Sequence, residues 1–472
     1  MRLCVLSFCA ALALSSGAVA QDKLEPPSSK YFVGKGAWGQ AFPDQWGLAA
    51  IGFDSSADSA WRLVRKNAEP VIVAVIDTGL DWNHRNIDWE NIWFNPKETP
   101  GNRLDDDKNG YVDDIMGWDF FARDNRPWDF DGHGTMVAGI IAGSWKDKDG
   151  IAGINPFARL MILKAVNNFG VTRSSFLAEA IAYAADNGAR VINLSVGGQG
   201  DAQVALEAID YAYSKGVVIV VAAGNEGVEV KNYGIAMSDK ILLIGATGHD
   251  DQHLGFSNWG NISVAAPGVD ILSMRARRTD TMVGLEGVKY KPGENYVGDD
   301  KRYYRASGTS FAAPFVAGLA SLMIANDPTL TNQQVMNIIK STARDVGTPG
   351  VNQFTGYGLI DARAALRASK DYRLLAGIAA LEVVQEHGKQ AVRVRGIADA
   401  DGFKGAKLEI GKGDDPKAWS VVANAPKCSA VDCVLGDIPA TQLAGAKTWQ
   451  IRVIVEHANG AKREARYTLK LG

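Results

Sequence analysis

Val71-Ile72-Val73-Ala74-Val75-Ile76 is a continuous apolar run dominated by β-branched residues, and it ends at Asp77. A run of this kind is typical of a strand buried on both faces of a parallel sheet, because such a strand has no face turned to water. Similar runs occupy residues 190–195, 217–222 and 241–246. The sequence therefore predicts several buried, parallel strands.

Helical patterns lie between these runs. Residues 174–188 form one pattern, from a Ser-Ser cap to a terminal glycine, and residues 202–214 form another. An Ala- and Gly-rich pattern over 311–325 is typical of a deeply buried helix. Because strands and helices alternate with short connections, we expect an α/β fold with a parallel sheet flanked by helices.

The chain of 472 residues is long enough for two domains, and its pattern of apolar and polar residues changes near residue 370. Residues 46–370 carry the α/β pattern, whereas 373–472 hold short alternating stretches separated by Gly, Asp and Asn turns. Those stretches predict a small C-terminal all-β sandwich. Residues 21–45 are rich in Pro, Ser, Gly and Lys, and we expect them to form an extended arm.

The N-terminus has the layout of an export signal. Arg2 precedes a mostly apolar stretch over 3–14, and small residues follow up to Ala20. We interpret residues 1–20 as a secretory signal peptide, which makes the mature protein secreted or periplasmic. No later stretch is long and apolar enough for a membrane span. A formal net charge of -3 without a basic run makes nucleic acid a poor partner.

Two of the four cysteines, Cys428 and Cys433, lie outside the signal peptide. Exported proteins meet oxidising conditions, so we expect these two to form a disulfide that closes a small loop. The alternative is a pair of free thiols.

Two polar residues stand where acid–base chemistry could be built. Asp77 follows the first strand run, at the carboxyl edge of a parallel sheet, where active sites form. His133 lies in Asp131-Gly132-His133-Gly134-Thr135, whose glycines allow other backbone to approach the imidazole closely. Taken singly, a strand-end Asp and a lone His more often have structural roles. Together they suit a carboxylate that orients a general base.

Two further residues could handle a nucleophile and its oxyanion. Asn225 follows the 217–222 run, where its amide could donate to a developing oxyanion. Ser310 precedes Pro314, which is tolerated in a first helical turn, so Ser310 should sit at a helix N-terminus that favours negative charge. A Ser at that place is most often only a cap. Each structural role is common for a single residue, but the four residues together, in the order Asp, His, Asn, Ser and each in its own segment, match one family closely.

This set resembles the subtilisin-like serine proteases, the subtilases. The resemblance rests on Val75–Gly79, Asp131–Thr135, Ala222–Asn225 and Gly308–Pro314, and it covers roughly residues 45–368. The chain order of acid, His and Ser is the order found in subtilisin. The resemblance implies a subtilisin-like catalytic domain over 46–370.

The resemblance also implies roles. Ser310 would attack the peptide carbonyl, and His133 would act as general base and then as general acid. Asp77 would orient the imidazolium. Asn225 and the Ser310 N–H would form the oxyanion hole.

The resemblance further implies where a substrate lies. The substrate backbone should pair with Ser195-Val196-Gly197 as an added strand. Ala222-Ala223-Gly224 should form the opposite wall of the primary specificity pocket. The expected protein is a monomeric serine endopeptidase that acts on protein or peptide substrates.

The chain departs from many relatives in three places. Met136 stands where they carry a second His, outside the triad. Asn86 occupies the place of an Asp that binds calcium, which weakens the case for that site. The stretch between Ala20 and Val71 leaves no room for the inhibitory pro-domain of many relatives. We therefore expect folding without one, aided by the C-terminal domain.

A second calcium candidate is the loop over 105–114. Oxygen-bearing residues at alternate positions and a Gly at the turn resemble the first half of a calcium loop. The predicted ligands are Asp105, Asp107, Asn109 and Asp113. Met116 replaces the bidentate Glu of a helix–loop–helix site. The alternative is a solvated acidic loop.

Other functions fit less well. An exported binding or adhesion protein on an inactive protease scaffold is the main alternative, but all four catalytic positions are present. An α/β-hydrolase esterase would need Gly-x-Ser-x-Gly and its Ser first in chain order. A His-Glu-x-x-His metalloprotease motif does not occur.

Overall fold

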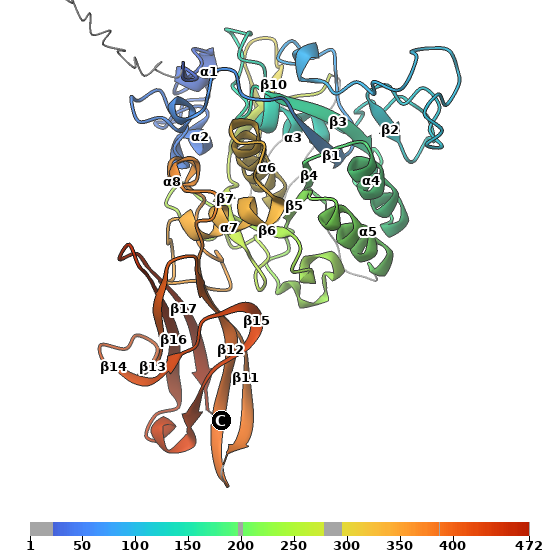
Figure 1. Cartoon of the computed structure of the whole chain (residues 1–472). Coiled ribbons are helices and arrows are strands. Elements are labelled where there is room, and N and C mark those ends of the chain that lie inside the picture. The colour runs from blue at the N-terminus through green and yellow to red at the C-terminus, as the bar shows by residue number, and fades with distance from the viewer. Residues whose placement is uncertain (1–21, 197–201, 278–294, 387, 472) are drawn as a thin grey trace, which may run out of the picture.

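The computed structural model describes residues 22–196, 202–277, 295–386 and 388–471 (Figure 1). The predicted signal peptide and Gly197 therefore lie outside the described residues. Seven strands form one parallel sheet in the order β2-β3-β1-β4-β5-β6-β7. Their bounds are β1 Val71–Asp77, β2 Gly117–Asp119, β3 Ala158–Lys164, β4 Val191–Leu194, β5 Val218–Ala222, β6 Leu242–Thr247 and β7 Val264–Pro267.

Helices cover both faces of this sheet (Figure 1). α3 (His133–Ala142), α6 (Thr309–Asn326) and α7 (Asn332–Thr342) share a core with one face, and α4 (Ser174–Asp186) and α5 (Gln203–Ser214) with the other. Consecutive residues of β1 explain both cores, since Val73 and Val75 face the first and Ala74 and Ile76 the second. The α/β prediction is confirmed.

Shorter elements complete the α/β region. They are α1 (Lys30–Val33), α2 (Trp46–Ala50), α8 (Ala362–Arg367), the 3-10 turns Ala60–Leu63, Trp89–Asn91, Val230–Asn232 and Gly234–Met237, and a small sheet of β8 (Ile271–Met274), β10 (Tyr303–Ala306) and β9 (Tyr296–Val297). Within the described ranges, α6 alone is long and apolar enough to cross a membrane, and 89% of it is buried inside the fold. It is the central helix of the core.

The arm over 21–45 differs from the extended segment that its composition predicts. It contains α1, and Tyr31 and Phe32 are buried in the same core as α3. Lys30 N donates to Lys148 O and Tyr31 N donates to Gly150 O. Burial of these two adjacent aromatic side chains thus holds the arm against the α/β region.

The C-terminal region is an antiparallel sandwich, as predicted (Figure 1). One sheet holds β11 (Leu374–Glu386), β12 (Lys389–Ala400) and β15 (Cys428–Pro439); the other holds β14 (Trp419–Ala425), β13 (Phe403–Lys412), β16 (Thr448–His457) and β17 (Lys462–Lys470). A 3-10 turn spans Ala440–Leu443. The predicted disulfide joins Cys428 and Cys433 within β15. Leu408, Ile451 and Val453 lie in the sandwich core.

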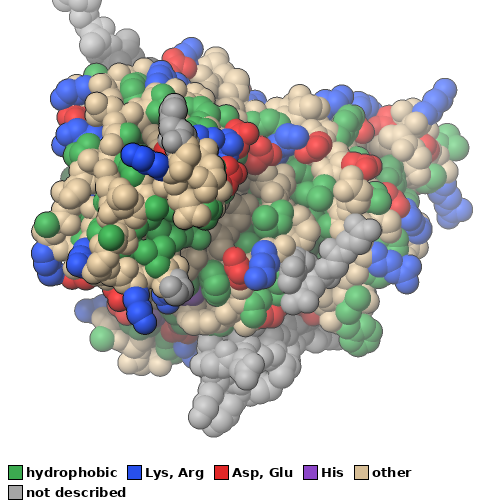
Figure 2. Space-filling model, turned by 90° about the horizontal axis from the view of Figure 1, so that it is seen from below, with side chains coloured by type: hydrophobic (Ala, Val, Ile, Leu, Met, Phe, Trp, Pro, Cys, Tyr) green, Lys and Arg blue, Asp and Glu red, His purple; other side chains and the backbone are tan. Residues whose placement is uncertain are grey.

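The sandwich docks on the α/β region through main-chain and arginine contacts. Val351 pairs with β17, donating to Glu464 O at 2.7 Å and accepting from Arg466 N at 3.2 Å. Arg463 of β17 donates to three carbonyls of the α/β region, those of Ser341, Ala343 and Tyr357. Acidic and basic side chains are interspersed over the face seen in Figure 2.

Candidate active site

The carboxyl end of β1 and the N-terminus of α3 meet at a carboxylate–imidazole pair. Asp77 is the last residue of β1 and is fully buried, and His133 is the first residue of α3. His133 Nδ1 lies 2.8 Å from Asp77 Oδ1 and 3.0 Å from Oδ2. The contact assigns the Nδ1 proton to the side that faces Asp77 and leaves Nε2 for a second partner.

Glycine makes this approach possible. A Cβ atom on Gly134 would lie 2.3 Å from Gly79 O, so any other residue there would push α3 away from the turn after β1. Gly79 itself has φ of +115°, a conformation that side chains rarely adopt. The backbones of the Asp-Thr-Gly and His-Gly-Thr segments therefore pack directly against each other.

Ser310 lies in the first turn of α6, one residue before Phe311, whose ring lies beside the imidazole. The His133 ring and the ring of its neighbour Phe311 have centroids 5.4 Å apart. Ser310 Oγ donates to Ser195 O at 3.1 Å, and Ser195 Oγ donates to Ser310 O at 2.8 Å. The nucleophile candidate is thus tied to the end of β4, and a rotation about χ1 would redirect its hydroxyl.

Asn225 is oriented by the residue that precedes Ser310. Its Oδ1 accepts from Thr309 N at 2.8 Å and from Thr309 Oγ1 at 3.0 Å, and Thr309 Oγ1 accepts from Gly224 N at 3.0 Å. With Oδ1 committed, Nδ2 is the group available to donate, and no partner for it occurs in the described part of the chain. Thr309 is a residue that the sequence reasoning did not single out.

The residues expected to line the substrate lie at two neighbouring strand ends. Ser195 and Val196 follow β4, and Ala222 to Gly224 end and follow β5, which is paired with β4 in parallel. Ala222 and Ala223 are buried, and Gly224 has φ of +99°. The two predicted walls are therefore adjacent.

The imidazole sits among three carboxylates. Burial lowers the pKa of His133, but the charge and hydrogen bond of Asp77, followed by the charges of Asp131 and Asp129, outweigh it and raise the pKa to about 9. Burial also raises the pKa of Asp129 and of Asp131. The site therefore stabilises an imidazolium, the form a general base takes after it accepts a proton.

A buried network behind the pair was missed from the sequence. Asp129, fully buried, accepts from Thr78 Oγ1, Gly132 N, Thr135 N and Thr135 Oγ1 at 2.6–2.9 Å. Thr78 Oγ1 in turn accepts from Gly134 N at 2.9 Å. One carboxylate thus joins the turn after Asp77 to the start of α3. An Asp two residues from Asp131 offers no signal that separates it from a turn former.

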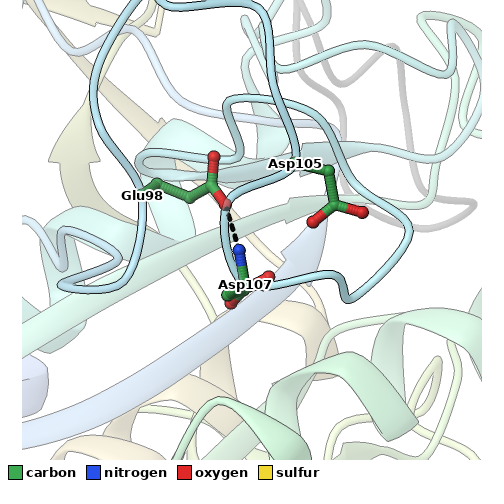
Figure 3. Close-up of side chains that lie close together, drawn as sticks. All are labelled: Glu98, Asp105 and Asp107. Atoms are coloured by element: carbon green, nitrogen blue, oxygen red, sulfur yellow. Dashed lines mark hydrogen bonds between the residues drawn. The ribbon is translucent and has the colours of Figure 1, made fainter.

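The acidic loop forms a separate cluster (Figure 3). Glu98, Asp105 and Asp107 each offer an oxygen, and these oxygens lie within 4.8 Å of one another. Glu98 Oε1 accepts from Asp106 N and Asp107 N, whereas its Oε2 is buried with no hydrogen-bond partner among the described residues. An orphaned carboxylate oxygen beside two further carboxylates fits a hard cation such as calcium.

The structure brings together only part of the predicted ligand set. Asp105 and Asp107 lie in the cluster, and Asn109 N donates to both. Asp113 does not join them, because its carboxylate accepts from Gly101 N and Arg103 N at 2.8 Å. Glu98, outside the alternating pattern, lies there instead.

Asn86 fills the position for which the sequence analysis questioned a calcium site. Its Nδ2 donates to Ser144 O and Ile151 O, and its Oδ1 accepts from Ile151 N and from Tyr303 Oη. The side-chain amide itself thus holds the 144–151 loop. Met136 is buried in the core.

Known proteins with similar sequences belong to one family. The sequence model of the Subtilase family matches residues 68–358. The thermophilic serine proteinase of Bacillus sp. (strain AK1) is 35% identical over 310 residues, which are 66% of this chain and 64% of that protein. Thermitase of Thermoactinomyces vulgaris is 31% identical over 312 residues, 66% of this chain and 93% of thermitase.

A solved structure is similar as well. The crystal structure of a cold adapted subtilisin-like serine proteinase is 25% identical, with a TM-score of 0.50 over 67% of this chain and 97% of that one. The chain spans less than two thirds of the length of the Bacillus proteinase, at 64%.

Proposed function

The chain belongs to the subtilase family, and from this premise we propose that it is a secreted serine endopeptidase with Ser310 as nucleophile. The observation that carries the proposal is the pair of His133 Nδ1 and Asp77, 2.8 Å apart at the N-terminal end of α3. A buried carboxylate on one imidazole nitrogen leaves the other nitrogen free to take a hydroxyl proton.

The proposed reaction uses residues of three elements. His133 Nε2 removes the proton of Ser310 Oγ as that oxygen attacks the peptide carbonyl, and the imidazolium then protonates the leaving amine. Asp77 stabilises the imidazolium and holds the ring in place. Asn225 Nδ2 and the Ser310 N–H donate to the oxyanion. In the second half of the reaction, His133 Nε2 takes a proton from a water molecule that attacks the acyl carbonyl. The ester bond to Ser310 Oγ then breaks, and the imidazolium returns the proton to that oxygen.

The substrate is proposed to add as a strand along Ser195 to Gly197, opposite Ala222 to Gly224. The parallel pairing of β4 with β5, which brings Ser195 and Ala222 to neighbouring strand ends, supports this placement. Protein or peptide substrates are the proposed partners, the enzyme is proposed to act as a monomer, and its proposed domains are 46–370 and 373–472.

Labelling with a fluorophosphonate tests the proposal. The folded wild-type chain should acquire one adduct on Ser310 and should cleave a peptide library, whereas Ser310→Ala should do neither. Equal cleavage by Ser310→Ala would refute the mechanism. No adduct on folded wild type would favour a binding protein on an inactive scaffold.

We also propose that calcium binds between Glu98, Asp105 and Asp107. It would supply charge neutralisation and would hold the loop over 95–114 in place. The buried, unpartnered Glu98 Oε2 supports this assignment. Among the ligands predicted from the sequence, Asn109 would act through its N–H bonds to the two aspartates.

Export is the remaining part of the proposal. The apolar stretch over 3–14 supports a signal peptide. The disulfide between Cys428 and Cys433 supports an oxidising destination.

A further inference from the structure

One buried cation near the triad has no part in the proposed chemistry. Lys164 ends β3, is 4% exposed, and stands in register with Asp77 of β1 and Asp119 of β2. A buried ammonium is costly unless its protons are donated and its charge is balanced. The protons of Lys164 are donated to backbone next to the triad residues, and its charge is balanced by carboxylates that include Asp77.

All three ammonium protons have acceptors. Lys164 Nζ donates to Thr78 O at 2.8 Å, to Trp128 O at 3.0 Å and to Asn168 Oδ1 at 2.9 Å. Thr78 directly follows Asp77, and Trp128 directly precedes Asp129 in the turn that leads into His133. A single group therefore clamps the two backbone segments that carry the acid and the base.

Three of the four carboxylates around the ammonium, those of Asp77, Asp129 and Asp131, also surround the imidazole. Burial lowers the pKa of Lys164, while the carboxylates of Asp119, Asp129, Asp131 and Asp77 oppose that shift. From α6, the Phe311 ring lies beside the imidazole, with ring centroids 5.4 Å apart. Lys164 is thus a cation among four carboxylates at this end of the sheet.

We propose that Lys164 is a positioning residue of the triad, which clamps the Asp77–Thr78 turn to the turn before His133 and offsets the negative charge around the imidazole. The proposal rests on the proposed function, because it assigns a role within that reaction. The ammonium does not contact substrate. It acts through Asp77 and His133.

The sign of the electrostatic effect follows from the charges. A positive charge near His133 disfavours the imidazolium, so its removal raises the pKa of the base. The base would then be neutral only at higher pH. Loss of the clamp alone would lower the rate at every pH and leave the midpoint unchanged, which separates the two roles.

The test is the pH dependence of Ser310 labelling by a fluorophosphonate. Lys164→Met removes charge and clamp, Lys164→Gln removes the charge but keeps an amide donor, and Lys164→Arg keeps the charge. Lys412→Met, at an exposed position of the β sandwich, is the control for an equal change in net charge. Lys164→Gln decides the question if Lys164→Met fails to fold.

We expect the midpoint to move upward by about half a pH unit or more in both neutral variants. Lys164→Arg and Lys412→Met should keep the wild-type midpoint, whatever their absolute rates. An unchanged midpoint in folded Lys164→Gln would overturn the charge-balancing role. If wild type itself is not labelled at Ser310, the proposed function fails instead, and the two failures are thereby distinct.

Discussion

Arg463 connects the β sandwich to the α/β region, and replacing it should loosen that junction. Its guanidinium donates to Ser341 O at 2.8 Å, Ala343 O at 2.9 Å and Tyr357 O at 3.1 Å. The first two carbonyls lie at the C-terminal end of α7. The last carbonyls of any helix have no partner within the helix, and a helix C-terminus favours a nearby cation. Arg463→Met would keep the aliphatic stem and remove all three bonds.

The magnitude follows from the bonds lost. At about 1 kcal/mol net for each hydrogen bond, the substitution should cost about 3 kcal/mol of stability. At about 4–8 °C for each kcal/mol in a domain of about 100 residues, that cost corresponds to roughly 12–24 °C in the Tm of the sandwich over 373–472. Val351 pairing with β17 should survive, because it uses backbone groups only.

Calorimetry of the Ser310→Ala protein, which should not digest itself, measures the effect at one scan rate. Arg466→Met is the matched control. Arg466 lies three residues further along β17, and its side-chain partners, Glu464 and the Trp419 ring, belong to the sandwich itself, so its loss should leave the junction intact. If Arg463→Met unfolds within about 1 °C of its parent, the docking argument is wrong.

Three further predictions concern the site. Asn225→Leu should lower kcat about 10²–10³-fold with little change in KM, the magnitude measured for such a donor in subtilisin, a member of this family; a change confined to KM in steady-state hydrolysis would contradict the oxyanion role. With the His133 pKa near 9, kcat/KM should rise with pH through that region, because the neutral imidazole is the base. The raised pKa also means that the His133–Asp77 pair stabilises the fold fully below pH 6.5 and that this contribution is lost as pH rises toward 9. Urea unfolding of His133→Ala against wild type at both ends of that window checks the sign, since an equal difference at both ends would refute it. EDTA should lower the Tm of wild type more than that of Glu98→Gln, and equal shifts would argue against calcium at Glu98.

The elements with strong local patterns were predictable. β1, β4, β5 and β6 are apolar runs with no solvent face, and their period and composition are enough to identify them. β3 was not identified, because Arg159 and Lys164 flank its apolar run and shorten it to residues 160–163. Both residues look like surface side chains until the fold places Lys164 at the triad.

Some candidate site residues could be predicted from the sequence, whereas others were recognised only in the structure. Asp77, His133, Asn225 and Ser310 stand out because each follows or begins a recognisable element, in a characteristic order. Asp129 and Thr309 carry the bonds that position them, yet an Asp or a Thr beside a turn is common in any loop. Their roles depend on partners far along the chain, such as Thr78 for Asp129 and Asn225 for Thr309.

The sequence by itself determined the α/β class, the C-terminal β region and the four residues of the proposed reaction, because strand periodicity and short motifs are local properties. Tertiary structure alone decided which charged side chains lie near which partners: Lys164 near four aspartates, Glu98 near the acidic loop, and Arg463 near the end of α7. Hydrogen bonds and Coulomb interactions depend on distance in space, and residues far apart in sequence acquire that distance only when the sheet and its helices assemble.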